Sequence, residues 1–385
     1  MQLRISLAAA TLLASMAVQA EDYVSLQYLQ YNESENRTAV SAPSIMLNKD
    51  FGTDYTLNVN FVADAVSGAS ENYYDAASGA SAFSRGIGIN ADDVTYGNVE
   101  YEDTRVAGGA TLITRLDNRD EVTVGLNYSS ESDFYSAEGS LEYMHWLTSS
   151  KNNSLSLGVS YQSNEVLVKC NPDSDTSSCD AGSGASEAMT NDAINAQVSY
   201  FQNINSESYF KASLFYVGDS GYLSNPYSNV VRNYDTGTNT ADIVGENRPD
   251  TRTGYGVSFK YANAITSNLS AHIGYRYYTD DWDINSHTID TDFYYEPSSD
   301  WLFKFGLRYY MQSEANFYSA EKDYFTNEEF ASSDVRLSNF DAITYKTDVE
   351  YKITDDFSVN FGVNYYDQSS GIDATYLVTG VTYKF

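Results

Sequence analysis

The chain has little of the chemistry from which metal and catalytic sites are usually built. Its 385 residues include two Cys and three His, and it contains neither an H-E-x-x-H nor a G-x-S-x-G motif. Proline is scarce as well, at five residues, so long strands can run with few interruptions. There are 22 basic and 53 acidic residues, and the formal net charge of −31 argues against nucleic acid or anionic lipid as partners.

Long apolar runs are absent after the first twenty residues. Residues 1–20 carry Arg4, an apolar stretch and a small-residue site before Glu21, the pattern of a secretory signal peptide. No later stretch approaches the roughly 18 apolar residues of a membrane-spanning helix. We therefore expect residues 21–385 to be exported as one unit without such a helix.

The two cysteines, Cys170 and Cys179, bracket a turn-forming segment. In an oxidising compartment they predict a local disulfide that pins a loop. A metal site is the alternative, although no His lies near them in the sequence.

Tyrosine is abundant, with 35 residues, and the end of the chain alternates strictly. In residues 372–385 one face carries Leu377, Thr379, Val381, Tyr383 and Phe385, which indicates a strand. A terminal strand with an apolar outward face would aggregate in water unless it were paired and covered. A closed barrel in lipid meets both needs, and the mean hydropathy of −0.42 suits one, because only alternate residues touch lipid.

The same alternation recurs along the chain and predicts a single all-β, antiparallel, up-and-down transmembrane barrel. Sixteen strands are expected, at about 23–31, 39–49, 54–66, 103–115, 120–130, 134–147, 154–166, 192–202, 207–217, 250–264, 268–280, 283–296, 301–312, 340–352, 356–367 and 372–385. A fourteen-stranded barrel is the alternative, because the first hairpin alternates weakly and contains Pro43.

Loop lengths indicate the orientation. The long connections, 67–102, 167–191, 218–249 and 315–339, all follow odd-numbered strands and would face outward, and the short ones would face the periplasm with both termini. This places the barrel in a bacterial outer membrane, with lipid and lipopolysaccharide as its surroundings. The terminal Tyr383 and Phe385 resemble an assembly signal for the barrel assembly machinery.

Three segments carry a family resemblance: Asp64–Ser70, Arg276–Thr288 and Trp301–Phe317, the last containing the run from Arg308 to Met311. Together they resemble the bacterial DUF3570 family. The resemblance implies an outer-membrane-type barrel of unknown function. It also suggests an association with redox proteins of the envelope.

Charged residues gather on the expected inner faces of consecutive strands. They are Lys260, His272, Arg276, Asp290, Asp292, Lys304, Arg308, Lys346, Asp348, Glu350 and Lys352. Because the strands are neighbours, these side chains should meet across hydrogen-bonded pairs. They could form a hydrated, salt-bridged wall, a constriction that selects solutes by charge, or a docking surface for a plug or partner.

Few residues suggest catalysis. Ser286 and His287, with Asp283 and Asp290 nearby, could seed a hydrolase, but alternation places His287 outside and Ser286 inside. We therefore expect no enzyme, no cofactor and no metal site. The acidic Asp173, Asp175 and Asp180 lack the spacing of a calcium loop and are interpreted as solvated surface.

Trp282 lies in a very short outer turn and is expected to anchor the barrel at the lipid interface. Taken together, the sequence favours porin-like passage of small solutes through a charged lumen. The alternative is a non-conducting structural or docking barrel for periplasmic or envelope partners. The solute, the partner and the oligomeric state are not encoded in any motif found.

Overall fold

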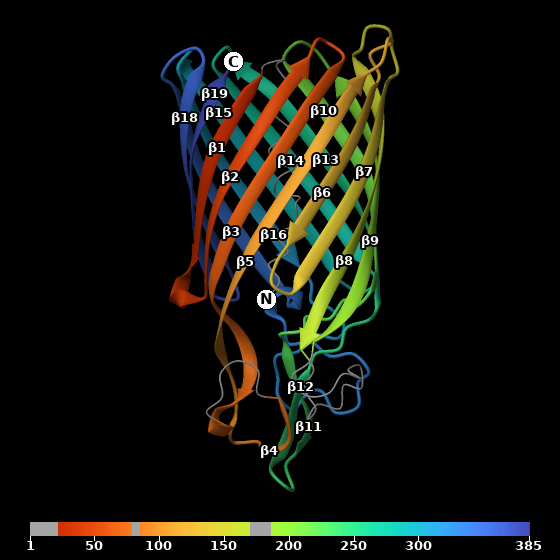
Figure 1. Ribbon diagram of the computed structural model, residues 1–385, viewed down its shortest axis with the longest axis vertical. Helices are drawn as coiled ribbons and strands as arrows, with labels where there is room; N and C mark the ends of the chain where they lie inside the picture. The colour runs from red at the N-terminus through yellow and green to blue at the C-terminus, as the bar shows by residue number, and fades with distance from the viewer. Residues whose placement is uncertain (1–21, 79–84, 170–185) are drawn as a thin grey trace.

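The computed structural model describes residues 22–78, 85–169 and 186–385, and these form a closed barrel with a folded extension at one end (Figure 1). The sixteen wall strands are β1 (Tyr23–Glu33), β2 (Thr38–Phe51), β3 (Tyr55–Asp75), β5 (Val94–Arg115), β6 (Glu121–Ser130), β7 (Phe134–Trp146), β8 (Asn153–Lys169), β9 (Ser186–Asn203), β10 (Ser208–Gly221), β13 (Thr251–Thr266), β14 (Leu269–Asp280), β15 (Asn285–Ser298), β16 (Trp301–Gln312), β17 (Phe340–Lys352), β18 (Phe357–Gln368) and β19 (Ile372–Lys384).

The remaining elements are short. A separate three-stranded sheet has the order β11 (Asn229–Asp235), β12 (Thr240–Gly245) and β4 (Gly86–Asn90). The described residues also include three single-turn 3-10 helices, η2 (Ser34–Asn36), η3 (Ala76–Ser78) and η4 (Val335–Leu337). Among residues 22–78, 85–169 and 186–385 there is no helix that is long and apolar enough to cross a membrane.

The first and last strands close the barrel. β1 pairs with β19 from Tyr23 opposite Lys384 to Glu33 opposite Ala374, and its other edge pairs with β2. Every wall pair is antiparallel, so the all-β fold and the count of sixteen are confirmed. The fourteen-stranded alternative is wrong, because Pro43 sits opposite Tyr28 within the continuous β1–β2 ladder.

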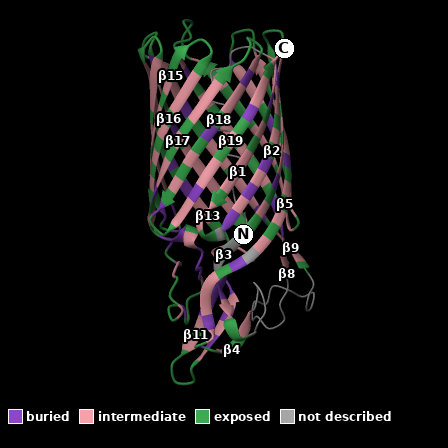
Figure 2. Ribbon diagram, turned by 90° about the vertical axis from the view of Figure 1, so that its left-hand side faces the viewer, coloured by how far each residue is buried: buried purple, intermediate pink, exposed green. Residues whose placement is uncertain are grey.

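The predicted outer face carries large exposed apolar side chains. Leu26, Leu126, Leu157 and Leu214 are 51%, 65%, 55% and 62% exposed, and each lies on the outward side of its strand. Exposed and intermediate residues dominate the wall in Figure 2. Such a surface is stable in hydrocarbon, where the closed ladder satisfies the backbone and apolar side chains face lipid.

β3 and β5 run further than alternation predicted. The β2 ladder ends at Gly68, which has φ 149° and faces the Arg37 backbone so closely that no Cβ would fit. Beyond this point β3 and β5 continue as a two-stranded ribbon, ending with Asp75 opposite Val94. Much of the predicted 67–102 loop is therefore strand. Alternation did not reveal it, because the two strands of the ribbon pair through their backbones and neither needs a regular apolar face.

The predicted 218–249 and 315–339 loops also contain ordered structure. We call residues 72–78, 85–93, 222–250, 281–284 and 313–339 the outer cap. The cap lies beyond the end of the barrel opposite the C-terminus (Figure 1). Its apolar side chains form small cores, one built on Val231 and Ile243 and another on Phe325 and Val230. Part of the predicted 167–191 loop lies outside the described residues. Cys170 and Cys179 both lie in that part, so their predicted disulfide is not described.

Trp282 belongs to the cap and not to the lipid interface, so the expected anchor role is wrong. Its side chain is 4% exposed and packs edge-on against Phe317, with the ring centroids 5.0 Å apart. The indole N–H donates to the Thr251 carbonyl, and the Arg252 guanidinium lies 4.6 Å from the ring centroid. Burial in a third cap core, with Ile284 and Leu337, holds the β14–β15 turn against the neighbouring loops.

Candidate functional site: the charged inner wall

The register of the strands places the predicted charged residues on the inner face. On β13 to β17 the outward positions are the exposed apolar ones, such as Phe259, Ile273, Phe305 and Tyr345. The alternate positions, which face the lumen, hold Lys260, His272, Arg276, Asp290, Asp292, Lys304, Arg308, Lys346, Asp348 and Glu350. These ten side chains thus line one continuous sector of the wall.

Four of these side chains form a compact ion-pair network. Arg308 Nε lies 2.7 Å from Asp290 Oδ1, directly across the β15–β16 ladder. Lys346 Nζ bridges the two acids, at 2.8 Å from Asp292 Oδ1 and 3.5 Å from Asp290 Oδ1. Side chains of opposite charge at neighbouring ladder positions stabilise the sheet.

Gly306 makes room for this network. It lies between Asp292 on β15 and Lys346 on β17 in one row of the ladder. A Cβ at this position would collide with Asp292 Oδ1 and press on Lys346 Cε. The absence of a side chain therefore allows Lys346 to reach over β16 to the acids of β15.

Three lysines nearby form no such pairs. Lys211 on β10 stands directly opposite Lys260 on β13, an arrangement of like charges that destabilises a ladder. Lys304 faces Asp348 in register, but among the described residues none of the three lysines forms an ion pair. Lys304 Nζ instead lies 5.6 Å from the Tyr294 ring centroid.

The other predicted residues lie beside this group. Arg276 stacks over Phe215, with its guanidinium carbon 4.5 Å from the ring centroid. His272 faces Asp292 in register and packs on Tyr294 at 4.8 Å between centroids. Glu350 lies opposite Leu302 and Asn360, near the end of β17, and no ion pair of Glu350 is found in the described part of the chain.

Acidic side chains line the opposite wall. In the closed strand order β7 and β17 are half a circuit apart, so they face each other across the lumen. β7 carries Glu138 and Glu142 on its inner face, and Glu138 accepts a hydrogen bond from Asn127 at 3.2 Å. Neither forms an ion pair with any described residue. Among the described residues the lumen therefore presents both lysines and carboxylates that have no ion-pair partner.

Several inward side chains remain accessible. Lys211, Glu142 and Arg276 are exposed although each faces the lumen, and the side chain of Arg308 is 40% exposed despite its ion pair. Since exposure requires open space beside a side chain, the interior at these levels is not filled by packing. A sixteen-stranded barrel is wide enough to contain water there.

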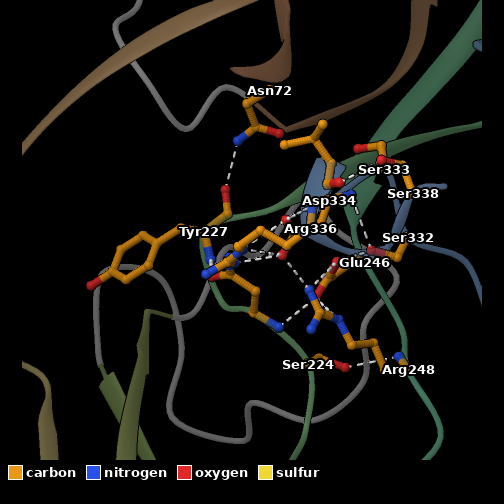
Figure 3. A network of polar contacts seen from close by, with 12 residues as sticks. Asn72, Ser224, Tyr227, Glu246, Arg248, Ser332, Ser333, Asp334, Arg336 and Ser338 are labelled. Atoms are coloured by element: carbon orange, nitrogen blue, oxygen red, sulfur yellow. Dashed lines mark hydrogen bonds and ion pairs between the residues drawn. The ribbon is translucent and has the colours of Figure 1, made fainter. Parts of the chain in front are cut away.

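A second polar network ties the outer cap together (Figure 3). Arg248 Nη2 donates to Glu246 Oε2 at 3.1 Å and to Asp334 Oδ2 at 2.7 Å, and Arg336 also pairs with Asp334. Ser332 donates to the Glu246 carboxylate. Burial raises the pKa of Glu246. Burial also opposes ionisation of Asp334, but the guanidiniums of Arg336 and Arg248 hold its pKa below the usual range.

The remaining predicted residues lie away from the charged group of the inner wall. His287 faces outward and meets the Tyr275 hydroxyl at 2.8 Å from Nδ1, whereas Ser286 is buried on the inner side. Tyr383 and Phe385 are 48% and 57% exposed at the end of β19. The sequence analysis did not predict a role for Lys211, although pairing the neighbouring strands would have placed it opposite Lys260. It also did not predict the ion pair between Asp64 and Arg105.

Comparison with solved structures supports the fold. CdiB from Acinetobacter baumannii is similar at a TM-score of 0.53 and 8% identity, covering 96% of this chain and 61% of that one. A bacterial polysaccharide outer membrane secretin is similar at 0.51 and 7% identity, covering 96% and 100%. The chain matches no curated protein sequence.

A family described as "Protein of unknown function (DUF3570)" matches residues 3–384. The three segments that suggested the resemblance all lie within this range. The chain belongs to the DUF3570 family.

Proposed function

We propose that this protein is an outer-membrane channel that passes small solutes through a charged, water-filled lumen. In this proposal residues 1–20 direct export and are removed. The observation that supports it best is that charged side chains on three strands of the inner wall, Lys211, Arg276 and Glu142, are exposed although they face the lumen.

The energetics of unpaired charge favour water in the lumen. A buried, unpaired ammonium or carboxylate is strongly unfavourable in an apolar interior, so charges without partners must be hydrated or hold a ligand. Lys211 and Lys260 repel each other, and Glu142 has no cation partner among the described residues. If the interior were packed and dry, apolar residues at these positions would make the barrel more stable than charged ones. The presence of charged residues therefore supports a water-filled lumen through which solutes pass.

The outer cap limits what can enter. Four connections, β3–β5, β10–β13, β14–β15 and β16–β17, meet in it, and the Arg248–Asp334 ion pair holds two of them together. A folded cap at the outer end favours small solutes over polymers.

Planar-bilayer conductance of the purified protein without residues 1–20 tests the proposal. Stable currents that depend on salt concentration are expected, and the reversal potential in a KCl gradient should report the balance of lumen charge. A correctly folded barrel that inserts and carries no current would contradict passage. A matched sample of heat-unfolded protein controls for leakage caused by detergent.

The folded cap favours a second candidate, a docking barrel whose role is to hold an envelope partner such as a redox protein. The cap has its own buried residues, such as Ile243 and Phe325, each at most 1% exposed, which a simple pore does not need. Deleting residues 229–245 separates the two: a channel keeps its current, whereas a docking barrel loses its partner. We propose no catalytic role, because Ser286 and His287 face opposite sides of the wall.

A further inference from the structure

Four rings form a continuous row on the inner wall. Phe201 on β9 contacts Tyr209 on β10 with 5.4 Å between centroids, and Tyr209 contacts His272 on β14 at 6.4 Å. His272 contacts Tyr294 on β15 at 4.8 Å. The row crosses five neighbouring strands, β13 included, in the half of the barrel nearer the short turns. An apolar strip of this size is not required for the passage of inorganic ions.

The unpaired lysines flank this row. Lys211 is two residues from Tyr209 on the same face of β10, and Lys260 lies across the ladder from Lys211. On the other side, Lys304 is directly opposite Tyr294, with its Nζ 5.6 Å from the ring centroid. The three ammonium groups therefore border the rings on both flanks.

Asp348 stands directly opposite Lys304 and offsets the charge of that lysine, whereas the acids of β15 do not neutralise Lys211 and Lys260. Asp290 pairs with Arg308, and Asp292 pairs with Lys346, so both acids already have cations of their own. Nδ1 of His272 is buried and has no hydrogen-bond partner among the described residues. The patch thus combines unmatched positive charge, a free polar ring atom and an aromatic surface.

We infer that this patch is a binding site for small organic anions that carry a planar apolar group, with an aromatic monocarboxylate as the simplest example. The carboxylate would lie between Lys211 and Lys260, which relieves the repulsion of the two ammonium groups. The ring would lie along Tyr209, His272 and Tyr294. The inference rests on the proposed function, to which it adds the class of solute.

The chemistry distinguishes this class from inorganic anions and from neutral aromatics. Chloride or phosphate would gain from the lysines alone, and the ring row would then contribute nothing. A neutral aromatic would gain from the rings and leave the lysines unneutralised. Only a molecule with both parts uses the whole patch, since ring stacking and charge pairing make separate contributions.

The test is ligand binding to the whole purified barrel in detergent, measured by saturation-transfer NMR with sodium benzoate, sodium acetate and benzyl alcohol. Benzoate should bind at least about tenfold more tightly than either of the others, because each of them lacks one part. The double variant K211M/K260M should lose about tenfold in benzoate affinity, and Lys260→Arg should retain it. Tyr294→Leu should weaken benzoate about threefold and leave acetate unchanged.

Lys151→Met, in an exposed turn between β7 and β8, is the matched control and should bind benzoate as the natural protein does. Resistance of the folded band to SDS verifies that each variant forms the barrel. Equal affinity for benzoate and acetate, or full affinity in K211M/K260M, would overturn the inference. The binding measurement does not depend on conductance. A barrel that binds benzoate selectively but carries no current contradicts the proposed channel function only. A barrel that conducts but does not prefer benzoate contradicts the binding site only.

Discussion

Arg248 and Asp334 lie on different connections of the barrel, and Arg248 Nη2 donates to Asp334 Oδ2 at 2.7 Å inside the outer cap. The side chains are 11% and 6% exposed, so the pair is buried. Arg336 shares the same carboxylate. One acidic side chain therefore holds two guanidinium groups together and joins the connection before β13 to the one before β17.

Replacing this acid should loosen the cap and spare the wall. In Asp334→Asn the two guanidiniums lose their shared charge, and removing one partner of a buried pair costs about 3 kcal/mol. Proteinase K should then cleave residues 313–339 several-fold faster, while the barrel keeps its SDS-resistant band. Asp355→Asn, in an exposed turn at the other end, is the control. Unchanged cleavage of the cap in Asp334→Asn would contradict this role.

The turn between β6 and β7 should depend on pH. Burial, and then the Asp103 carboxylate, raises the pKa of Glu131 to about 7. Because this is above the usual value, the protonated form favours the folded turn. The stabilisation is complete below about pH 4.5 and is lost as pH rises through 7.

Hydrogen exchange of residues 131–134, corrected for its intrinsic pH dependence, measures this effect. Protection should fall between pH 5 and pH 8 in the natural protein and stay constant in Glu131→Gln, which remains neutral throughout. Equal pH dependence in both proteins would assign the change to another group.

A side chain at Gly306 should disturb the ion-pair network. Valine there would collide with Asp292 and Lys346, and such overpacking costs about 1–3 kcal/mol. The fraction of SDS-resistant barrel after refolding should drop in Gly306→Val and less so in Gly306→Ala. Gly139→Ala is the control, because its added Cβ would meet only Leu126 at 3.8 Å. A full yield of folded Gly306→Val would show that the network has room to move.

Charge on the inner wall should set ion selectivity. Arg308→Ala removes a cation and leaves Asp290 with Lys346 at 3.5 Å, so the reversal potential in a KCl gradient should shift toward cations. Asp290→Asn should shift it toward anions. Arg119→Ala, in the exposed short turn between β5 and β6, should leave it unchanged. Identical reversal potentials in all four proteins would exclude this wall as the selective element.

The last residue should matter for assembly more than for stability. Phe385 is 57% exposed and stacks on Tyr383 at 6.3 Å, and Lys49 Nζ lies 5.1 Å from its ring centroid. Phe385→Ala therefore removes few contacts. We expect several-fold less barrel in the outer membrane of cells, with normal refolding in detergent. A matching loss of refolding in detergent would assign Phe385 a structural role and no signal.

Period-two alternation could predict the wall because each strand there has one face in lipid and one in the lumen. Phe305 and Leu307 lie outside, and Lys304 and Arg308 lie inside, as the spacing alone requires. The order of strands followed from antiparallel neighbours joined by short turns. The ion pairs could be predicted only in part. Lys346 reaches the acids of β15 because Gly306 has no side chain, and alternation does not predict such a gap.

The outer cap could not be predicted in this way. Its strands β11 and β12 are seven and six residues long, and their partner β4 comes from a connection more than a hundred residues earlier. Local patterns do not encode such distant pairing. Trp282 shows the consequence, because an aromatic residue in a short outer turn has the same sequence signature whether it faces lipid or packs on Phe317.

Swelling of liposomes that contain the purified barrel tests the passage of solutes most directly. Vesicles loaded with an impermeant polymer are diluted into isotonic sodium benzoate, sodium acetate or a neutral disaccharide, and light scattering follows their volume. The account predicts fast swelling in benzoate, slower swelling in acetate and the slowest in the disaccharide, with none in vesicles that lack protein. Vesicles with folded barrel that do not swell in any of the three solutes would contradict it.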